Sequence, residues 1–217
     1  MTARGPVLVV GDVNTDVVVV LAGAPAPGSD RAASITNRGG GAGANVAVHL
    51  AAQGVDVVLA GAVGDDAAGA ALAAELRTAG VRTALQVVPG APTGTVVSLV
   101  EPDGQRSMLT DRGANLGLRG EALPGPSAGG HVHLSGYTLL DDRSRSAGLA
   151  ALSAARAAGC TVSVDPASTG PLAAAGVERW LTDTGGADLL LPNRDEALLL
   201  GGGTDPVDAA RSLAGRY

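Results

Sequence analysis

The sequence contains no lysine, and all 15 of its basic residues are arginine. Catalysis through a lysine Schiff base and phosphate binding by a P-loop lysine are therefore excluded within these 217 residues. Cysteine occurs once, as Cys160, so no disulfide can form within the chain and we expect a reducing, cytoplasmic location. The apolar run at 17–22 is far too short to span a bilayer, so no membrane partner is predicted.

The residues that are abundant indicate a folded α/β protein. Hydrophobic residues make up 46% of the sequence, chiefly Ala, Val and Leu, and glycine occurs 33 times. This composition favours helices packed closely on a sheet over a disordered chain. The formal net charge is −6 and no basic patch is visible, so nucleic acid is not an expected partner.

Buried strands alternate with helices along most of the chain. Aliphatic runs predict strands, and Ala-rich runs that stop at Gly predict helices. The expected strands are 7–11, 55–63, 131–135, 161–165 and 188–191, and the expected helices are 44–53, 67–79, 142–158 and one that opens at 205–206. This alternation predicts an α/β fold with a doubly wound, mainly parallel sheet, in which ligands bind beyond the carboxyl ends of strands.

A more polar group of strands interrupts this alternation. Residues 17–21 and 30–38 could pair as antiparallel strands. Residues 93–101 and 105–111 flank a Pro-Asp-Gly turn, which is a strong hairpin signal. We expect these strands to form a small separate sheet, inserted at about 14–38 and 93–112.

Polar side chains follow the first buried strand at alternate positions. If the chain stays extended there, Asp12, Asn14 and Asp16 lie on one face. A carboxylate accepts hydroxyl protons and a carboxamide both donates and accepts, so this group suits a vicinal diol. Spacing alone favours the simpler interpretation, which is a polar turn between strands.

A glycine-rich turn, Gly39 to Gly43, precedes the next expected helix. Glycines allow close backbone approach to a ligand, and a helix N-terminus presents free N–H groups. Asn45 in the first turn is a plausible ligand group. The run also fits G-x-G-x-x-A, which would indicate a nicotinamide-dependent oxidoreductase, but that motif should follow the first buried strand. The oxidoreductase therefore stays a remote alternative.

Two further candidates lie at later strand ends. Arg112 follows the second hairpin strand and could fork onto a carboxylate or hydroxyls, although a lone Arg there is more often a surface charge. Asn193 and Glu196 follow a buried strand with helical spacing. They could hold a hydrated Mg²⁺ beside phosphates, or they could simply cap a helix.

The order of these motifs resembles that of the ribokinase-like (PfkB-type) carbohydrate kinases. The matching segments are Gly-Asp-Val-Asn-Thr-Asp at 11–16, Gly-Gly-Ala-Gly-Ala-Asn-Val-Ala at 40–47, Val-Gly-Asp-Asp-x-x-Gly at 63–69, Arg-Gly-Ala-Asn at 112–115 and Pro-Asn-x-x-Glu at 192–196. Together they span nearly the whole chain.

The resemblance implies ATP-dependent phosphorylation of a sugar hydroxyl. It assigns sugar binding to Asn14, Asp16, Gly40, Gly41 and Asn45, with Arg112 close to the substrate. It assigns Mg²⁺ and phosphate to Asn193 and Glu196, the latter acting on the metal through water. The small sheet would be a lid that closes over the substrate and builds a homodimer interface.

Two features depart from the family pattern. Ala42 stands where ribokinases proper carry Lys, which weakens a specific assignment to ribose. The family's Asp-Thr-x-Gly-Ala-Gly-Asp motif, whose last Asp is the general base, does not occur in these 217 residues. We therefore expect the general base and most of the nucleotide site beyond Tyr217, and residues 1–217 to be an incomplete, inactive domain. A non-catalytic sugar-binding or regulatory protein is the alternative.

Overall fold

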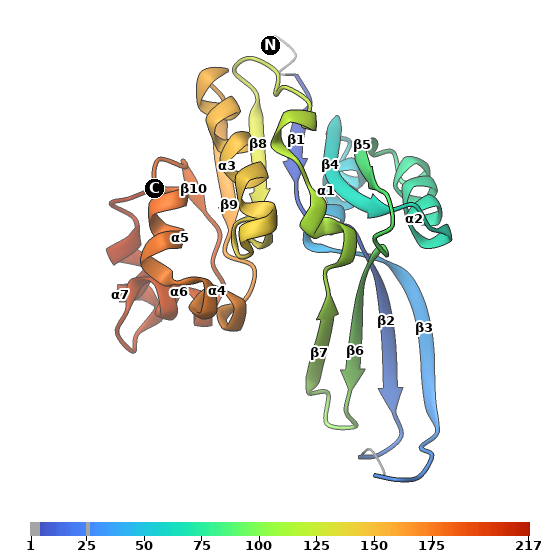
Figure 1. Ribbon diagram of the computed structural model, residues 1–217. Helices are drawn as coiled ribbons and strands as arrows, with labels where there is room; N and C mark the ends of the chain where they lie inside the picture. The colour runs from blue at the N-terminus through green and yellow to red at the C-terminus, as the bar shows by residue number, and fades with distance from the viewer. Residues whose placement is uncertain (1–4, 25–26) are drawn as a thin grey trace.

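A computed structural model describes residues 5–24 and 27–217, which form two sheets (Figure 1). Six parallel strands make the central sheet, in the order β10-β9-β8-β1-β4-β5. Four strands make a second sheet that projects from the first, in the order β3-β2-β6-β7. The predicted parallel α/β sheet and the separate small sheet are both confirmed.

All elements are short and regular. The central strands are β1 (Val7–Val10), β4 (Val57–Gly64), β5 (Arg82–Val88), β8 (His131–Ser135), β9 (Thr161–Asp165) and β10 (Leu189–Leu190). The projecting strands are β2 (Asn14–Leu21), β3 (Ala33–Gly40), β6 (Gly94–Val100) and β7 (Arg106–Asp111). The helices are α1 (Ala42–Ala52), α2 (Ala67–Thr78), α3 (Asp142–Ala157), α4 (Thr169–Ala175), α5 (Val177–Thr184), α6 (Arg194–Gly201) and α7 (Pro206–Leu213), with short 3₁₀ turns at Gly113–Gly117, Gly120–Ala122 and Gly136–Leu139.

Helices cover both faces of the central sheet, because its strands are apolar on both sides. On one face α1 and α2 pack against Val9 and Leu59. On the other face α3 and α5 pack against Leu134 and Val164, and Trp180 of α5 is 1% exposed in this layer. The sheet is therefore doubly wound, as predicted.

The projecting sheet has mixed pairing. Strands β2 and β3 are antiparallel, as are β6 and β7 across the predicted hairpin. The two pairs join through β2 and β6, which run parallel. The sheet is built from residues 14–40 and 94–111, close to the expected insertions.

The chain passes between the two sheets four times, and all four turns lie at their junction (Figure 1). The turns are residues 11–13, 41, 89–93 and 112. Asp66 stabilises the turn at residues 89–93. Its carboxylate accepts a hydrogen bond from Gly69 N at 2.8 Å, which caps α2, and another from Thr93 N at 2.8 Å. The junction is thus a fixed meeting point of strand ends, where ligands bind in α/β folds.

Strand β5 and helices α4 and α5 were not predicted, and α6 was expected only as one of two alternatives at 193–196. Strand β5 is an edge strand that pairs only with β4, so its sequence is less apolar than the buried strands. Gly170 and Pro171 obscure the helical pattern of α4, which lies directly before α5.

No helix in the described ranges is long and apolar enough to cross a membrane.

Candidate functional site

A cavity of about 200 Å³, here called the junction cavity, lies where the two sheets meet. Its walls are Asp12, Asn14, Asp16, Gly41, Ala42, Asn45, Val96, Met108, Thr110 and Tyr137. Four of the predicted sugar-binding residues therefore meet in one cavity, although they come from β2, the glycine turn and α1. The predicted convergence of Asp12, Asn14 and Asp16 on one face is also seen.

The Asp16 carboxylate and the Asn45 carboxamide are the most available polar groups of the cavity. No hydrogen bond joins either side chain to another residue within the described parts of the chain. Burial raises the pKa of Asp16 above its usual value, and the charge of Arg38 on β3 opposes this in part. The Asp16 carboxylate can therefore accept hydrogen bonds from a ligand, and the Asn45 carboxamide can both donate and accept them.

The glycine turn shapes the cavity because Gly40 and Gly41 have no side chains. Gly41 has a φ of 99°, and a Cβ atom there would lie 2.9 Å from Asn14 N. A Cβ atom on Gly40 would overlap the Asp16 carboxylate, so Gly40 makes room for that side chain. Gly40 does not itself line the cavity. The turn follows β3 of the projecting sheet, which is not the strand that a dinucleotide fingerprint follows.

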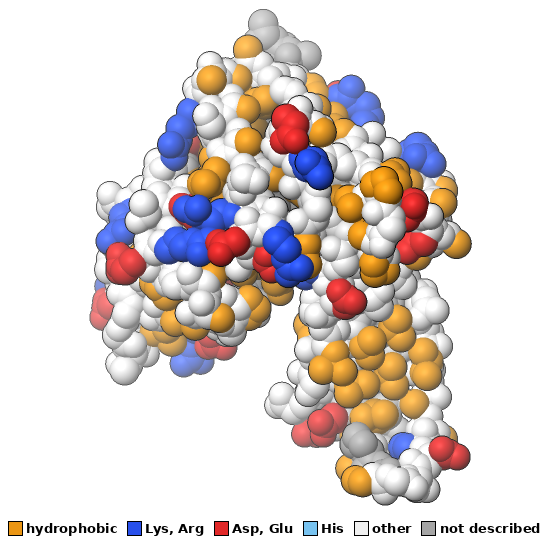
Figure 2. All heavy atoms as spheres, in the orientation of Figure 1, with side chains coloured by type: hydrophobic (Ala, Val, Ile, Leu, Met, Phe, Trp, Pro, Cys, Tyr) orange, Lys and Arg blue, Asp and Glu red, His pale blue; other side chains and the backbone are white. Residues whose placement is uncertain are grey.

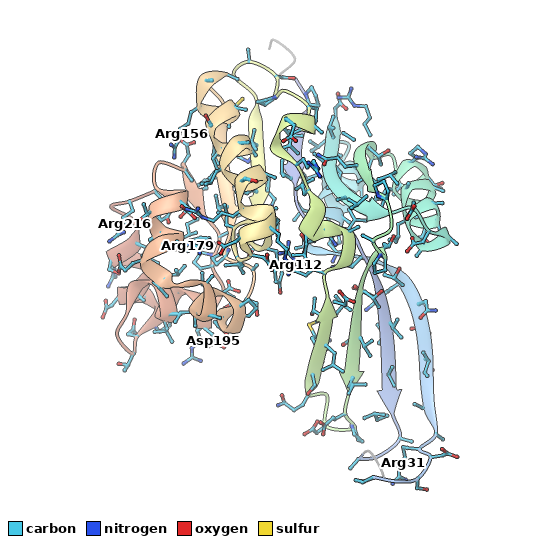
Figure 3. The ribbon with its side chains drawn as sticks, viewed as in Figure 1. Arg31, Arg112, Arg156, Arg179, Asp195 and Arg216 are labelled. Carbon is cyan, nitrogen blue, oxygen red and sulfur yellow. The ribbon has the colours of Figure 1, made fainter. Side chains whose placement is uncertain are left out.

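Arg112 lies at the junction of the two sheets (Figure 3). It forms a two-pronged ion pair with Asp12. Its Nε donates to Asp12 Oδ2 at 2.9 Å and its Nη2 donates to Oδ1 at 2.8 Å. The guanidinium also lies 5.9 Å from the ring centre of Tyr137, and Nη1 donates to Ser144 Oγ at 3.3 Å. The fork engages a carboxylate of the chain itself, 100 residues away in the sequence, so contact of Arg112 with a ligand stays a prediction.

A second cavity of about 350 Å³, the side cavity, adjoins the first. Met108, Thr110 and Tyr137 line both cavities. The remaining walls are Arg112, Leu140, Asp141, Ser168 and Pro171. Sequence reasoning missed Met108 and Thr110 as shared walls, although they alternate on one strand and so predict a common face.

The side cavity also borders a strained backbone. Ala167, directly before Ser168, is the one described non-glycine residue with positive φ, at 81°. Its N–H donates to Asp165 Oδ1 at 2.7 Å, which stabilises this conformation. Strain of this kind persists where the surroundings hold it, and it is concentrated at functional sites.

Asn115 is a site residue whose function the sequence did not reveal. It is 3% exposed and uses both ends of its carboxamide on the turn after β1. Its Oδ1 accepts Val13 N at 2.9 Å, and its Nδ2 donates to Val13 O at 3.0 Å and Asn14 Oδ1 at 2.8 Å. A third Nδ2 contact, 3.0 Å to Arg112 O, links that turn to the end of β7.

Asn193 and Glu196 lie outside both cavities and cap α6. Asn193 Oδ1 accepts Glu196 N at 3.0 Å, and Glu196 Oε2 accepts Asn193 N at 2.9 Å. Burial raises the pKa of Glu196, and the nearby Asp165 adds to the effect. No cluster of three or more His, Cys, Asp or Glu arranged for a metal occurs in the described ranges. The capping alternative is therefore seen, while a metal function stays a prediction.

The two sheets and the cavity at their junction define the ribokinase-like class of kinase fold. A solved structure of adenosine kinase from Sinorhizobium meliloti superposes on this fold with a TM-score of 0.85 and 23% identity, over 99% of this chain and 72% of that one. A family profile described as "pfkB family carbohydrate kinase" matches residues 5–215. The chain belongs to this family.

Two curated relatives have sequences that match parts of the chain. An ATP-dependent ribose-1-phosphate kinase from Halopiger xanaduensis is 35% identical over 164 residues, covering 74% of this chain and 53% of that protein. A fructokinase from Klebsiella pneumoniae is 38% identical over 130 residues, covering 58% of this chain and 42% of that protein. The chain thus spans about half the length of the curated relatives it matches.

Proposed function

We propose that this chain supplies the sugar-binding part of an ATP-dependent carbohydrate kinase, which phosphorylates a hydroxyl of a sugar or sugar-like molecule. The observation that carries the proposal is the convergence of Asn14, Asp16 and Asn45 in the junction cavity. Asp16 accepts hydrogen bonds from two sugar hydroxyls, and Asn45 donates a hydrogen bond to a neighbouring hydroxyl and accepts one from it. Gly41 lets the ligand approach the backbone, and Gly40 keeps the space for Asp16.

The projecting sheet serves as the lid over this cavity in our proposal. Val96, Met108 and Thr110, on β6 and β7, form one wall, while α1 and Tyr137 form the others. Closure of the sheet would exclude water from the transferring phosphoryl group. Water exclusion matters because phosphoryl transfer depends on positioning and on charge stabilisation.

The fit of ATP and Mg²⁺ to the described residues is partial. Glu196 uses Oε2 in the capping box and keeps Oε1, and Asn193 Oδ1 keeps its second lone pair, so both can accept from a water of a hydrated metal ion. Bound Mg²⁺ would neutralise phosphate charge during transfer. The residues themselves would hold and orient that hydrated ion from the start of α6.

We further propose that two copies pair through the outer face of the projecting sheet, in the cytoplasm, where the lone Cys160 stays reduced. The register places Val17, Val19, Ile35, Val97 and Leu109 together on the face opposite Asp16 and Thr110. Ile35 and Leu109 are 63% and 60% exposed. Figure 2 shows hydrophobic side chains gathered over this sheet. An apolar face of this kind supports an interface between copies.

Calorimetry with the folded chain tests the binding proposal. We expect D-ribose, D-fructose or another neutral sugar of a broad panel to bind, and Asn45→Ala to weaken that binding by ~10-fold or more, as the loss of a ligand hydrogen bond does. Asn37→Ala, on the exposed β3, is the matched control and should leave affinity unchanged.

Phosphoryl transfer is tested with Mg-ATP and a version of the chain extended by a segment that carries the Gly-Ala-Gly-Asp motif. Turnover with a bound sugar would support the kinase. Binding without turnover in that version would favour a non-catalytic sugar-binding protein instead.

A further inference from the structure

The walls of the two cavities carry more negative than positive charge. Within the part of the chain that the structure describes, three carboxylates line them, those of Asp12, Asp16 and Asp141, and one cation, Arg112. Ala42 faces the junction cavity from the first turn of α1 and adds no charge. Asp12 and Asp141 are ion-paired with arginines, so a phosphate or carboxylate group of a ligand would meet no unpaired cation on these walls and would be repelled by Asp16.

The positive charge of Arg112 is already paired, because Asp12 occupies its Nε/Nη2 edge and Ser144 Oγ accepts from its Nη1. The two-pronged geometry, at 2.9 and 2.8 Å, is the one with which arginine holds phosphate groups. The two side chains are only 13% and 5% exposed, so water screens the pair little. An anionic ligand would have to displace Asp12 and leave its carboxylate buried without a partner, which is strongly unfavourable.

Arg143 and Arg38, which do not line the cavities, also face carboxylates. Arg143 donates to Asp141 through Nε at 2.9 Å and Nη2 at 2.8 Å. Arg38 lies on β3 opposite Asp16 in the register and lines neither cavity. Neither arginine therefore offers an unopposed positive charge to a ligand.

We infer that Asp12, by holding Arg112, makes this site select uncharged sugars, polyols or nucleosides and reject phosphorylated sugars and sugar acids. The inference rests on the proposed function and names the substrate class of the same site. Arginine has five N–H groups, and those of Arg112 that remain unpaired can still donate to neutral hydroxyls. Leu140 and Pro171 in the side cavity suit a substituent that carries no charge.

The wild-type chain tests this selectivity directly by calorimetry with four probes: D-ribose, D-fructose, ribose 5-phosphate and inorganic phosphate. We expect a neutral sugar to bind at least ~10-fold more tightly than ribose 5-phosphate, and inorganic phosphate not to bind, because of the repulsion from the cavity carboxylates. Equal or tighter binding of ribose 5-phosphate would overturn the inference while leaving the sugar site intact.

The variant Asp12→Asn keeps the side-chain shape, removes one charge and frees Arg112. We expect it to gain binding of inorganic phosphate and to bind ribose 5-phosphate at least ~10-fold more tightly than the wild type does. The double variant Asp12→Asn/Arg112→Gln is the matched control and should lose this gain. A natively folded Asp12→Asn chain that gains no phosphate binding contradicts the inference, and if it does not fold, the wild-type comparison decides.

Failure of the proposed function gives a different pattern. In that case no neutral sugar binds the wild-type chain, while Asp12→Asn still gains phosphate binding that the double variant lacks. Charge selection by Asp12 would then stand, and the assignment of the cavity to a sugar would fall.

Discussion

At the residue scale, the geometry of the junction cavity depends on Asn115. This buried carboxamide holds the turn after β1 through Val13 and Asn14 and joins it to the end of β7 through Arg112 O. Together with the pairing of Asn14 in β2, these bonds hold the direction in which Asn14 enters the cavity.

We predict that Asn115→Ala lowers the free energy of unfolding by about 2–4 kcal/mol, because Val13 N and Asn14 Oδ1 would be buried without partners. Sugar affinity should fall as well, since Asn14 loses its support. Urea unfolding and calorimetry measure the two effects. Asn37→Ala, on an exposed strand, should change stability by less than about 0.5 kcal/mol. Equal effects of the two substitutions would contradict this function of Asn115.

A second residue-scale prediction concerns two histidines that share one hydroxyl. His131 Nε2 and His133 Nδ1 contact Ser163 Oγ at 2.8 and 2.9 Å. Burial lowers the pKa of both histidines below 6.5. As pH falls through about 6.5, the unfolded chain therefore binds protons on these histidines while the folded chain keeps them neutral. The free energy of unfolding is highest above this pH and decreases below it.

We therefore predict that the free energy of unfolding falls between about pH 7.5 and pH 5.5, and that the fall is smaller in the double variant His131→Gln/His133→Gln. Urea unfolding at each pH measures the difference between the two proteins, so that contributions from carboxyl groups cancel. His49→Gln, on an exposed helix position, is the control. An identical pH dependence of stability in the wild type and the double variant would show that His131 and His133 do not contribute to it.

At the element scale, the connection from β3 to α1 is the part of the site that sequence patterning predicts best. Its glycine run, the helix that follows and Asn45 in the first turn all lie where predicted, because positive φ and close approach leave a direct signature in glycine. The start of α1 at Ala42 is two residues earlier than expected, since Gly41 already acts as the N-cap.

Alanine substitution separates backbone strain from steric overlap at this connection. Gly41 and Gly54 both have positive φ, 99° and 76°, but only at Gly41 would a Cβ meet backbone, 2.8 Å from the Asp12 carbonyl carbon. Strain alone costs about 1–2 kcal/mol. We predict that Gly41→Ala destabilises the fold by at least about 2 kcal/mol more than Gly54→Ala does, measured by urea unfolding. Equal costs would mean that the turn relaxes without disturbing Asp12.

Other elements lay beyond sequence patterning for physical reasons. Strand β5 pairs on one side only, so it lacks the apolar run of a buried strand. Strand β10 was predicted at 188–191, but it is only two residues long and is not buried as expected. Helix α5 could have been found, because Val177, Trp180, Leu181 and Thr184 repeat at helical spacing. The parallel pairing of β2 with β6 joins segments about 80 residues apart, and no local pattern encodes it.

At the scale of the whole molecule, the proposed pairing of two copies predicts a specific mutational response. Leu109→Asp or Ile35→Asp would place a charge on the apolar outer face of the projecting sheet and should convert a dimer to a monomer, because a desolvated, unpaired charge is costly. Light scattering after gel filtration measures the mass. Val87→Asp, equally exposed at 59% on the central sheet, is the control and should stay dimeric. A monomeric wild type would refute the pairing.

Long-range contacts explain why the sequence predicted the site only in part. Alternation after one strand predicted Asp12, Asn14 and Asp16, and glycines predicted Gly41, since both patterns are local. The bond from Arg112 to Asp12 spans 100 residues, and Tyr137 reaches the cavity from the 3₁₀ turn after β8, so only the folded chain brings these residues together.

The central claim is that the junction cavity binds a sugar, and nuclear magnetic resonance of the ¹⁵N-labelled chain tests it most directly. On titration with D-ribose or D-fructose, the account predicts shifts in the backbone amides of residues 12–16 and 40–45 and in the side-chain amide of Asn45, with residues 201–213 unmoved. Shifts confined to other regions, or no shift with any neutral sugar of a broad panel, would contradict it.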